Sequence, residues 1–146
     1  MAGKGAALRG RWVVDASIAV GWVHTAQGTQ QTRALLEALL DGAEAFAPAL
    51  WPVEVSNALL SLERRGKLTA SDRQTALQHL AALPIELDHE MARIAFGEAA
   101  ALATSQKLSV YDALYLELAV RLDSSLACRG GALREAARRL RVPVLP

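Results

Sequence analysis

The feature that most constrains this fold is the alternation of short apolar segments with longer stretches of helical periodicity. Trp12–Val14 is short, apolar and rich in β-branched side chains, which is typical of a buried strand. Leu35, Ala38 and Leu39 recur at the spacing of one helix face. Strands that alternate with helices form parallel βα units. The sequence therefore predicts an α/β fold, a three-layer α/β/α sandwich with a central, mainly parallel sheet.

Glycines, prolines and capping residues set the expected boundaries of these elements. We expect strands at residues 12–14, 45–47, 84–87, 125–128 and 142–145. We expect helices at residues 17–24, 29–40, 52–66, 69–83, 90–106, 109–122 and 131–140. The chain has no internal repeat or linker, so we predict one domain at residues 12–146 that follows a flexible leader at residues 1–11.

Composition then excludes several classes of protein. With 146 residues, of which 52% are hydrophobic, the chain is long and apolar enough for a packed core. Its net charge is only +1, so any contact with nucleic acid depends on a local basic patch. The single cysteine, Cys128, is expected in the core and permits no intramolecular disulfide, which fits the reducing cytoplasm. No apolar run approaches the ~20 residues needed to cross a bilayer, and the histidines lack the spacing of zinc ligands.

Three acidic residues, far apart in the sequence, each stand at the start of an expected helix. They are Asp15, Glu54 and Asp112. In an open parallel sheet, ligands bind beyond the carboxyl ends of the strands, where the following helices begin. We therefore expect the three carboxylates to share a crevice there, where their mutual repulsion favours a bound cation. An all-oxygen acidic site suits Mg²⁺ or Mn²⁺, and the associated chemistry is phosphoryl transfer or hydrolysis.

Each acid also has a purely structural interpretation. Asp15 would cap the helix that follows it, Glu54 would stabilise a helix dipole, and Asp112 would close a capping box. The same capping pattern at Thr69–Asp72 is assigned no function. The two interpretations differ on whether the fold brings the three acids together.

Arginines and lysines gather in two places. Arg64, Arg65 and Lys67 end one expected helix. A second group surrounds the last helix and comprises Arg129, Arg134, Arg138, Arg139 and Arg141. Such residues either guide a phosphate backbone or stabilise helix C-termini while remaining solvated. Of all these residues, Arg129 is the one assigned to substrate, because it follows a strand end beside the expected acidic crevice.

In three segments the chain resembles PIN-domain proteins, specifically the VapC type of bacterial toxin ribonuclease. Val13–Ser17 resembles the first family motif, Ala47–Leu59 the second, and Leu108–Ala119 the third and most distinctive. The resemblance extends over residues 12–145. It implies a PIN-like domain with a Mg²⁺ or Mn²⁺ site that cleaves single-stranded RNA. It also implies a VapB-type antitoxin as partner and a homodimer.

The resemblance assigns roles to individual residues. Asp15, Glu54 and Asp112 match the catalytic acids that hold the metal ion. Ser17 matches the small polar residue beside the first acid, and Asn57 matches the asparagine of the second motif. We predict that Ser17 and Asn57, like Arg129, contact the substrate.

One position departs from the family pattern. The family usually carries a fourth acid after the last core strand, and this chain has Gly130 there. Fewer charged ligands weaken metal binding. Two functions therefore compete: a metal-dependent endoribonuclease that acts as a toxin, and a weakened domain that mainly binds RNA or an antitoxin. A phosphatase or nucleotide-binding domain is disfavoured because the chain has no Gly-rich phosphate loop.

Overall fold

A five-stranded parallel sheet forms the centre of the computed structural model, which describes residues 8–146. The strands lie in the order β3-β2-β1-β4-β5, and every neighbouring pair is parallel. Their bounds are β1 Arg11–Val14, β2 Glu44–Pro48, β3 Ile85–Asp88, β4 Ser125–Ala127 and β5 Val144–Leu145. The predicted α/β class is confirmed, and the sheet is parallel throughout.

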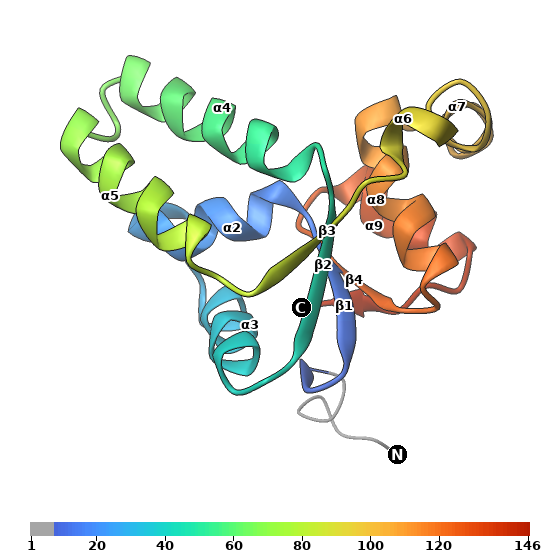
Figure 1. Cartoon of the computed structure of the whole chain (residues 1–146), viewed down its shortest axis with the longest axis horizontal. Helices are drawn as coiled ribbons and strands as arrows, with labels where there is room; N and C mark the ends of the chain where they lie inside the picture. Colours follow the sequence, from blue (N-terminus) through green and yellow to red (C-terminus); the bar gives the residue numbers. More distant parts are fainter. Residues whose placement is uncertain (1–7) are drawn as a thin grey trace.

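Helices cover both faces of the sheet, so the molecule has three layers (Figure 1). One side carries α2 Ala16–Val23, the short 3-10 helix η1 Thr25–Gln27, α3 Gln30–Leu40, α4 Trp51–Arg64 and α5 Ala70–Ala81. The other side carries α6 Met91–Ile94, α7 Glu98–Gln106, α8 Val110–Arg121 and α9 Gly131–Arg139. This is the sandwich that the alternating sequence pattern predicts.

Strand β1 lies at the middle of the sheet because its side chains are apolar on both faces. Trp12, Val13 and Val14 are each fully buried. Val13 pairs with Phe46 of β2 on one side and with Leu126 of β4 on the other. A strand buried on both faces reads as a continuous apolar run, as this one does. The order of strands reverses around β1, and such a reversal creates a crevice at the carboxyl edge of the sheet.

The predicted single helix at residues 90–106 is wrong. The segment forms two helices, α6 and α7, which are separated at Gly97. Gly97 has φ −112° and ψ −101°, outside the helical region. Glycine is a weak helix former because it loses the most backbone entropy on ordering, so the Ala-rich pattern does not carry the helix through this position.

The two ends of the predicted domain also differ in detail. A flexible leader is predicted at residues 1–11. Residues 1–7 of this segment lie outside the described residues, and the description begins at residue 8. From there Leu8 packs against the core and accepts a hydrogen bond from Trp12 Nε1 at 3.1 Å. The last strand is shorter than predicted, because the Val142 amide donates to Ala137 of α9 at 2.8 Å and Pro143 has no amide hydrogen.

The helices between residues 8 and 146 include none with the length and apolar character needed to span a membrane.

Two leucines of α3 test the assignment of its buried face. Leu35 is fully buried, whereas Leu40 is 65% exposed. We expect Leu35→Ala to lower the free energy of unfolding by ~2–5 kcal/mol, because it leaves a cavity in the core. Leu40→Ala, the matched control on the same helix, should change it by less than ~0.5 kcal/mol. Urea denaturation measures both, and equal losses would contradict this orientation of α3.

Candidate active site

Asp15 directly follows β1 and stands at the N-terminal boundary of α2. Its amide donates to Ala127 O of β4 at 2.9 Å, which continues the ladder between the two strands. It occupies the N-cap position of α2, yet its side chain makes no capping hydrogen bond. The Oδ2 atom instead accepts a hydrogen bond from Ser17 Oγ at 2.7 Å. The amides of Ala16 and Ser17 also favour the ionised carboxylate and act to lower its pKa. Helix capping therefore accounts for part of its surroundings, and the bond from Ser17 Oγ is additional.

Glu54 lies in the first turn of α4, the helix that follows β2. Its Oε1 atom accepts a hydrogen bond from the hydroxyl of Tyr115 at 2.9 Å. Tyr115 comes from α8 on the other side of the sheet and is fully buried. This bond connects the two helical layers at the carboxyl edge and fixes the orientation of the Glu54 carboxylate.

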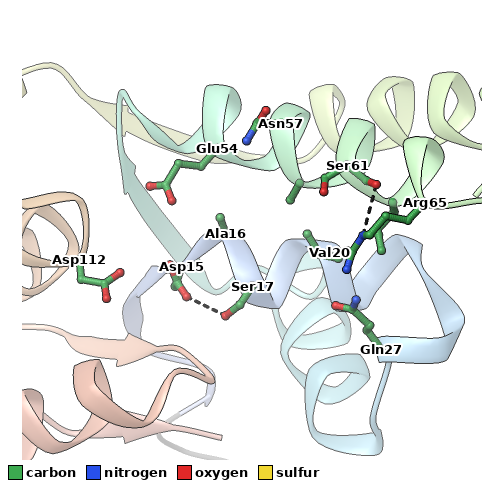
Figure 2. A pocket seen from close by; sticks show the side chains of 12 residues that line it. Asp15, Ala16, Ser17, Val20, Gln27, Glu54, Asn57, Ser61, Arg65 and Asp112 are labelled. Atoms are coloured by element: carbon green, nitrogen blue, oxygen red, sulfur yellow. Dashed lines mark hydrogen bonds between the residues drawn. The ribbon is translucent and has the colours of Figure 1, made fainter. Parts of the chain in front are cut away.

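Asp112 lies in the first turn of α8. Its amide donates to Ser109 Oγ at 3.0 Å, which is half of the predicted capping box. The reverse bond, from the Ser109 amide to the Asp112 carboxylate, is not formed. The carboxylate is half-buried and faces the cavity beside Asp15 (Figure 2).

The three carboxylates line one cavity of about 460 Å³ at the carboxyl edge of the sheet. Figure 2 shows Asp15 from the sheet edge, Glu54 from α4 and Asp112 from α8 directed toward a shared space. Burial raises the pKa of all three carboxyl groups. The charge of Asp15 raises the pKa of both other acids further. The fold therefore brings together the three acids that the sequence singled out.

These residues fit a hard divalent cation by donor type and charge. Carboxylate oxygens are preferred by Mg²⁺ and Mn²⁺. A cation would offset the burial that raises all three pKa values, and the charge of Asp15 that raises those of Glu54 and Asp112 further. Within residues 8–146, no three Asp, Glu, His or Cys side chains lie close enough to form a closed metal site as they stand. Water molecules would therefore have to complete the coordination, as is usual for Mg²⁺.

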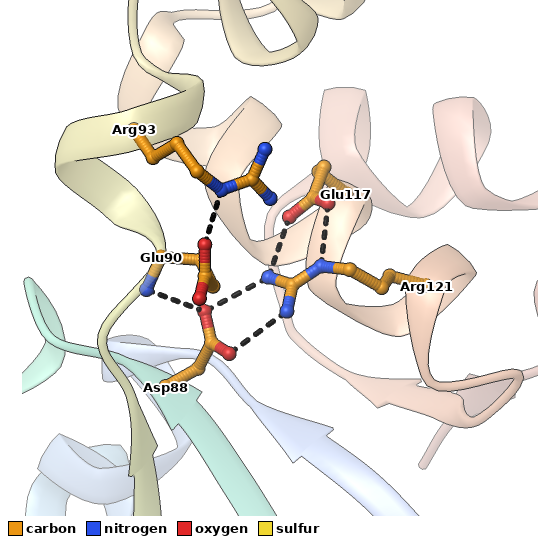
Figure 3. A network of polar contacts seen from close by, with 5 residues as sticks. All are labelled: Asp88, Glu90, Arg93, Glu117 and Arg121. Carbon is orange, nitrogen blue, oxygen red and sulfur yellow. Dashed lines mark hydrogen bonds and ion pairs between the residues drawn. The ribbon is translucent and has the colours of Figure 1, made fainter.

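An ion-pair network anchors α8, the helix that supplies Asp112 and Tyr115. Arg121 donates to both oxygens of Asp88, at the end of β3, over 2.9 and 2.8 Å. It also donates to the two oxygens of Glu117 over 2.7 and 3.0 Å (Figure 3). The paired Arg121 guanidinium holds the pKa of Asp88 below its ordinary value. Bidentate pairs add geometric specificity, so the network helps to fix α8 against the sheet.

The other predicted site residues lie at different distances from the acids. Ser17 and Asn57 both line the acidic cavity. Arg129 does not, because its guanidinium turns toward η1 and donates to Gln27 O at 2.5 Å. It lines a neighbouring cavity instead. Arg129 thus holds the backbone of the segment that carries Gln27.

Gly130 and Cys128 follow β4 at the same edge. Gly130 is the N-cap of α9 with φ −68°, and a Cβ added there would meet no heavy atom within 4 Å. The position therefore has room for an acidic side chain.

Cys128 is fully buried, and burial raises the pKa of its thiol to about 12. A neutral buried thiol matches its predicted place in the core.

Sequence reasoning missed two site residues and left a third undecided. Tyr115 was not singled out, and neither was Gln27, which lines the acidic cavity from η1. Arg65, grouped only with a basic cluster, also lines this cavity. For Tyr115 a signal was present, since it follows Asp112 by three residues and shares its helix face. Gln27 lies on a short 3-10 turn that no periodic pattern indicates.

Comparisons with known proteins find a matching family model and several similar structures. A family model for the PIN domain matches residues 12–139. Among solved structures, the VapBC2 complex of Rickettsia felis, bound to a promoter DNA fragment, is similar with a TM-score of 0.65 and 12% identity. The match covers 92% of this chain and 96% of that one. No curated protein sequence matches.

Two further structures share the fold. PAE2754 of Pyrobaculum aerophilum has a TM-score of 0.64 and 17% identity, covering 89% of this chain and 87% of that chain. FitAcB of Neisseria gonorrhoeae has a TM-score of 0.62 and 16% identity, covering 92% and 96% respectively. The fold that the PIN-domain resemblance implied is therefore confirmed.

The stability of the metal-free protein should depend on the charge of Asp15. Burial raises the pKa of this carboxyl above its ordinary value of 3.8, so the folded state binds more protons than the unfolded state above that pH. Its contribution to stability is therefore present at low pH and is lost as pH rises through the raised pKa. With a chelator present, Asp15→Asn should raise the thermal midpoint at pH 7, and the gain should shrink toward pH 4.

Asp88→Asn is the matched control, with the opposite expected sign. The pKa of Asp88 is lowered by Arg121, so its contribution is present at neutral pH and is lost as pH falls through the lowered value. This variant should be less stable than the parent at pH 7. Destabilisation of the metal-free protein by Asp15→Asn at pH 7 would contradict the cost of burying an ionised Asp15 carboxylate.

Proposed function

The chain belongs to the PIN domain family, and we propose that it is a metal-dependent endoribonuclease that hydrolyses phosphodiester bonds of single-stranded RNA. PIN domains are in general nucleases. The observation that carries the proposal is the cavity at the carboxyl edge of the sheet, which is lined by Asp15, Glu54 and Asp112. Three half-buried or buried carboxylates without a cationic partner among them are an arrangement that a divalent cation stabilises.

The residues of the chain have distinct tasks in this proposal. Asp15, Glu54 and Asp112 hold the cation directly or through water. Ser17 orients the Asp15 carboxylate through the 2.7 Å hydrogen bond, and Tyr115 orients Glu54 through the 2.9 Å bond. Such supporting bonds fix metal ligands and tune their affinity. Asn57 offers an amide to the substrate from the cavity wall.

A bound Mg²⁺ or Mn²⁺ would supply Lewis acidity toward the phosphoryl group and would lower the pKa of a water molecule. No histidine lines the cavity within the described residues, and the Cys128 thiol is neutral and buried. The cavity therefore offers neither a hydroxyl activated by histidine nor a reactive thiol, and direct attack by water is the simplest reaction that its residues support.

We further propose that the protein acts as the toxin of a VapBC-type pair in the cytoplasm, with a VapB-type antitoxin as partner and a homodimer as its assembly. Support comes from the solved VapBC2 complex of Rickettsia felis, whose fold is similar over most of the chain. The distinctive segment Leu108–Ala119 supports the same family type.

A second candidate function rests on Gly130. This residue stands where the family usually carries a fourth acid, at the N-cap of α9 and the same sheet edge as Asp15. With three carboxylates the site holds a cation less tightly than with four. The alternative is a weakened PIN domain that mainly binds RNA or an antitoxin.

Cleavage of a mixed pool of single-stranded RNA tests the leading proposal. We expect the purified chain to cleave the pool with Mn²⁺ or Mg²⁺ and to stop when a chelator is added. Asp15→Asn should abolish cleavage, because it removes a charged ligand while keeping the side-chain shape. Asp123→Asn, which changes an exposed acid that does not line the cavity, is the control and should cleave as the parent does. Metal-independent cleavage, or an active Asp15→Asn variant, would contradict the proposal.

Gly130→Asp separates the two candidate functions. The position is open and its φ of −68° suits any residue, so the variant should fold. Aspartate is also a favoured N-cap residue and should stabilise α9 slightly. If the missing acid limits activity, Gly130→Asp should cleave faster than the parent at low metal concentration, whereas Gly130→Asn should not. An inactive parent with an active Gly130→Asp variant favours the weakened domain. No cleavage by either protein rules out the nuclease.

A further inference from the structure

The acidic cavity is an elongated groove rather than a point site. Its lining comes from one face of α4, from α2 and η1, and from the start of α8, and comprises Asp15, Ala16, Ser17, Val20, Gln27, Glu54, Asn57, Ala58, Ser61, Leu62, Arg65 and Asp112. From Glu54 to Arg65 the helix advances eleven residues, which is ~16 Å at ~1.5 Å per residue. The groove therefore continues well beyond the carboxylates.

Charge changes sign along this groove. The three acids lie at one end, and Arg65 lies at the other end, where α4 finishes (Figure 2). Among the described residues that line the groove, Arg65 is the single cation. Between the two ends Asn57 and Ser61 contribute polar side chains. Along the cavity, the acidic cluster is thus followed by neutral polar side chains and then by the Arg65 guanidinium.

Arg65 is available to a ligand, unlike several other arginines of the chain. In residues 8–146 it takes part in no ion pair. Within the described part of the chain, its only side-chain hydrogen bond is a long one, from Nε to Ser61 O at 3.4 Å. The nearest acid in sequence, Glu63, pairs with Arg73 at 3.4 Å instead. Most of the donors of the Arg65 guanidinium therefore remain free to face the groove.

We propose that this groove holds the backbone of the RNA beside the scissile bond, and that Arg65 contacts a phosphate away from that bond. The inference rests on the proposed ribonuclease function and adds a subsite to it. The ~16 Å along the α4 axis between Glu54 and Arg65 is longer than the spacing of neighbouring phosphates in one strand, which is ~3.4 Å along a duplex axis and larger in an extended single strand. An RNA bound at the acids therefore reaches Arg65 only if it extends for several nucleotides along the groove. The protein accordingly favours substrates of that length.

The alternative is that Arg65 only stabilises the C-terminus of α4 while solvated. Arg64 provides the matched control, because it is the neighbouring arginine at the same helix end and does not line the groove. Any effect of lost charge or helix dipole applies to Arg64→Gln as well as to Arg65→Gln. Only an RNA contact within the groove distinguishes the two variants.

Fluorescence anisotropy with a labelled, unstructured RNA 12-mer and a trinucleotide, in chelator and over a range of salt concentrations, tests the proposal. Arg65→Gln should weaken binding of the 12-mer several-fold at low salt and reduce the slope of log K against log salt by ~0.7, the loss of one phosphate contact. Arg64→Gln should change neither by a comparable amount, and Arg65→Lys should restore the slope because it keeps the charge. Binding of the trinucleotide should not change.

Four results would overturn this proposal: an unchanged slope in Arg65→Gln, an equal loss in Arg64→Gln, an equal loss for the trinucleotide, or no RNA binding by the parent. Cleavage assays on the same preparations keep the two proposals apart. An Arg65-dependent slope in a chain that cleaves no RNA would reject the nuclease and keep the groove. Cleavage without any effect of Arg65 would reject the groove and keep the nuclease.

Discussion

Burial of three carboxylates at the carboxyl edge of the sheet, to which repulsion adds at Glu54 and Asp112, is the constraint on which the candidate site depends. Burial and mutual charge make ionised Asp15, Glu54 and Asp112 unfavourable together. Individual contacts hold them in place nonetheless: Asp15 is held by the ladder to β4, and Glu54 by the hydroxyl of Tyr115. The clustering of these acids is the physical basis on which a cation site and a function are proposed for this protein.

The parallel sheet explains how acids so far apart in sequence meet. Asp15 ends the central strand, Glu54 begins a helix of one layer, and Asp112 begins a helix of the other. The site therefore depends on how both layers pack against the sheet. The Arg121 network at β3 and the Tyr115 hydroxyl each connect α8 to the remainder of the edge. On the α4 side the same site opens into the groove that leads to Arg65.

The sequence predicted those features that depend on local pattern. The buried strand around Val13, the alternation of layers and the meeting of the three acids at one edge all follow from periodicity and chain order. It did not predict features set by single tertiary contacts. The alanine pattern predicts one helix through Gly97, whereas the helix is interrupted there. The spacing of alanines carries no information about the backbone geometry of this glycine. Arg129 follows a strand at the right edge, yet a carbonyl of η1 draws its guanidinium away from the acids, and no pattern encodes that contact.

Calorimetric titration of the purified chain with Mn²⁺ tests the central claim most directly, because it measures the cation site without reference to any substrate. The account predicts saturable binding that strengthens as pH rises, since the carboxyl groups must lose protons from raised pKa values to bind metal. It also predicts that Asp15→Asn, Glu54→Gln and Asp112→Asn each weaken binding strongly. No Mn²⁺ binding, or binding that survives any one of these three substitutions undiminished, would contradict the claim that the three acids form one site.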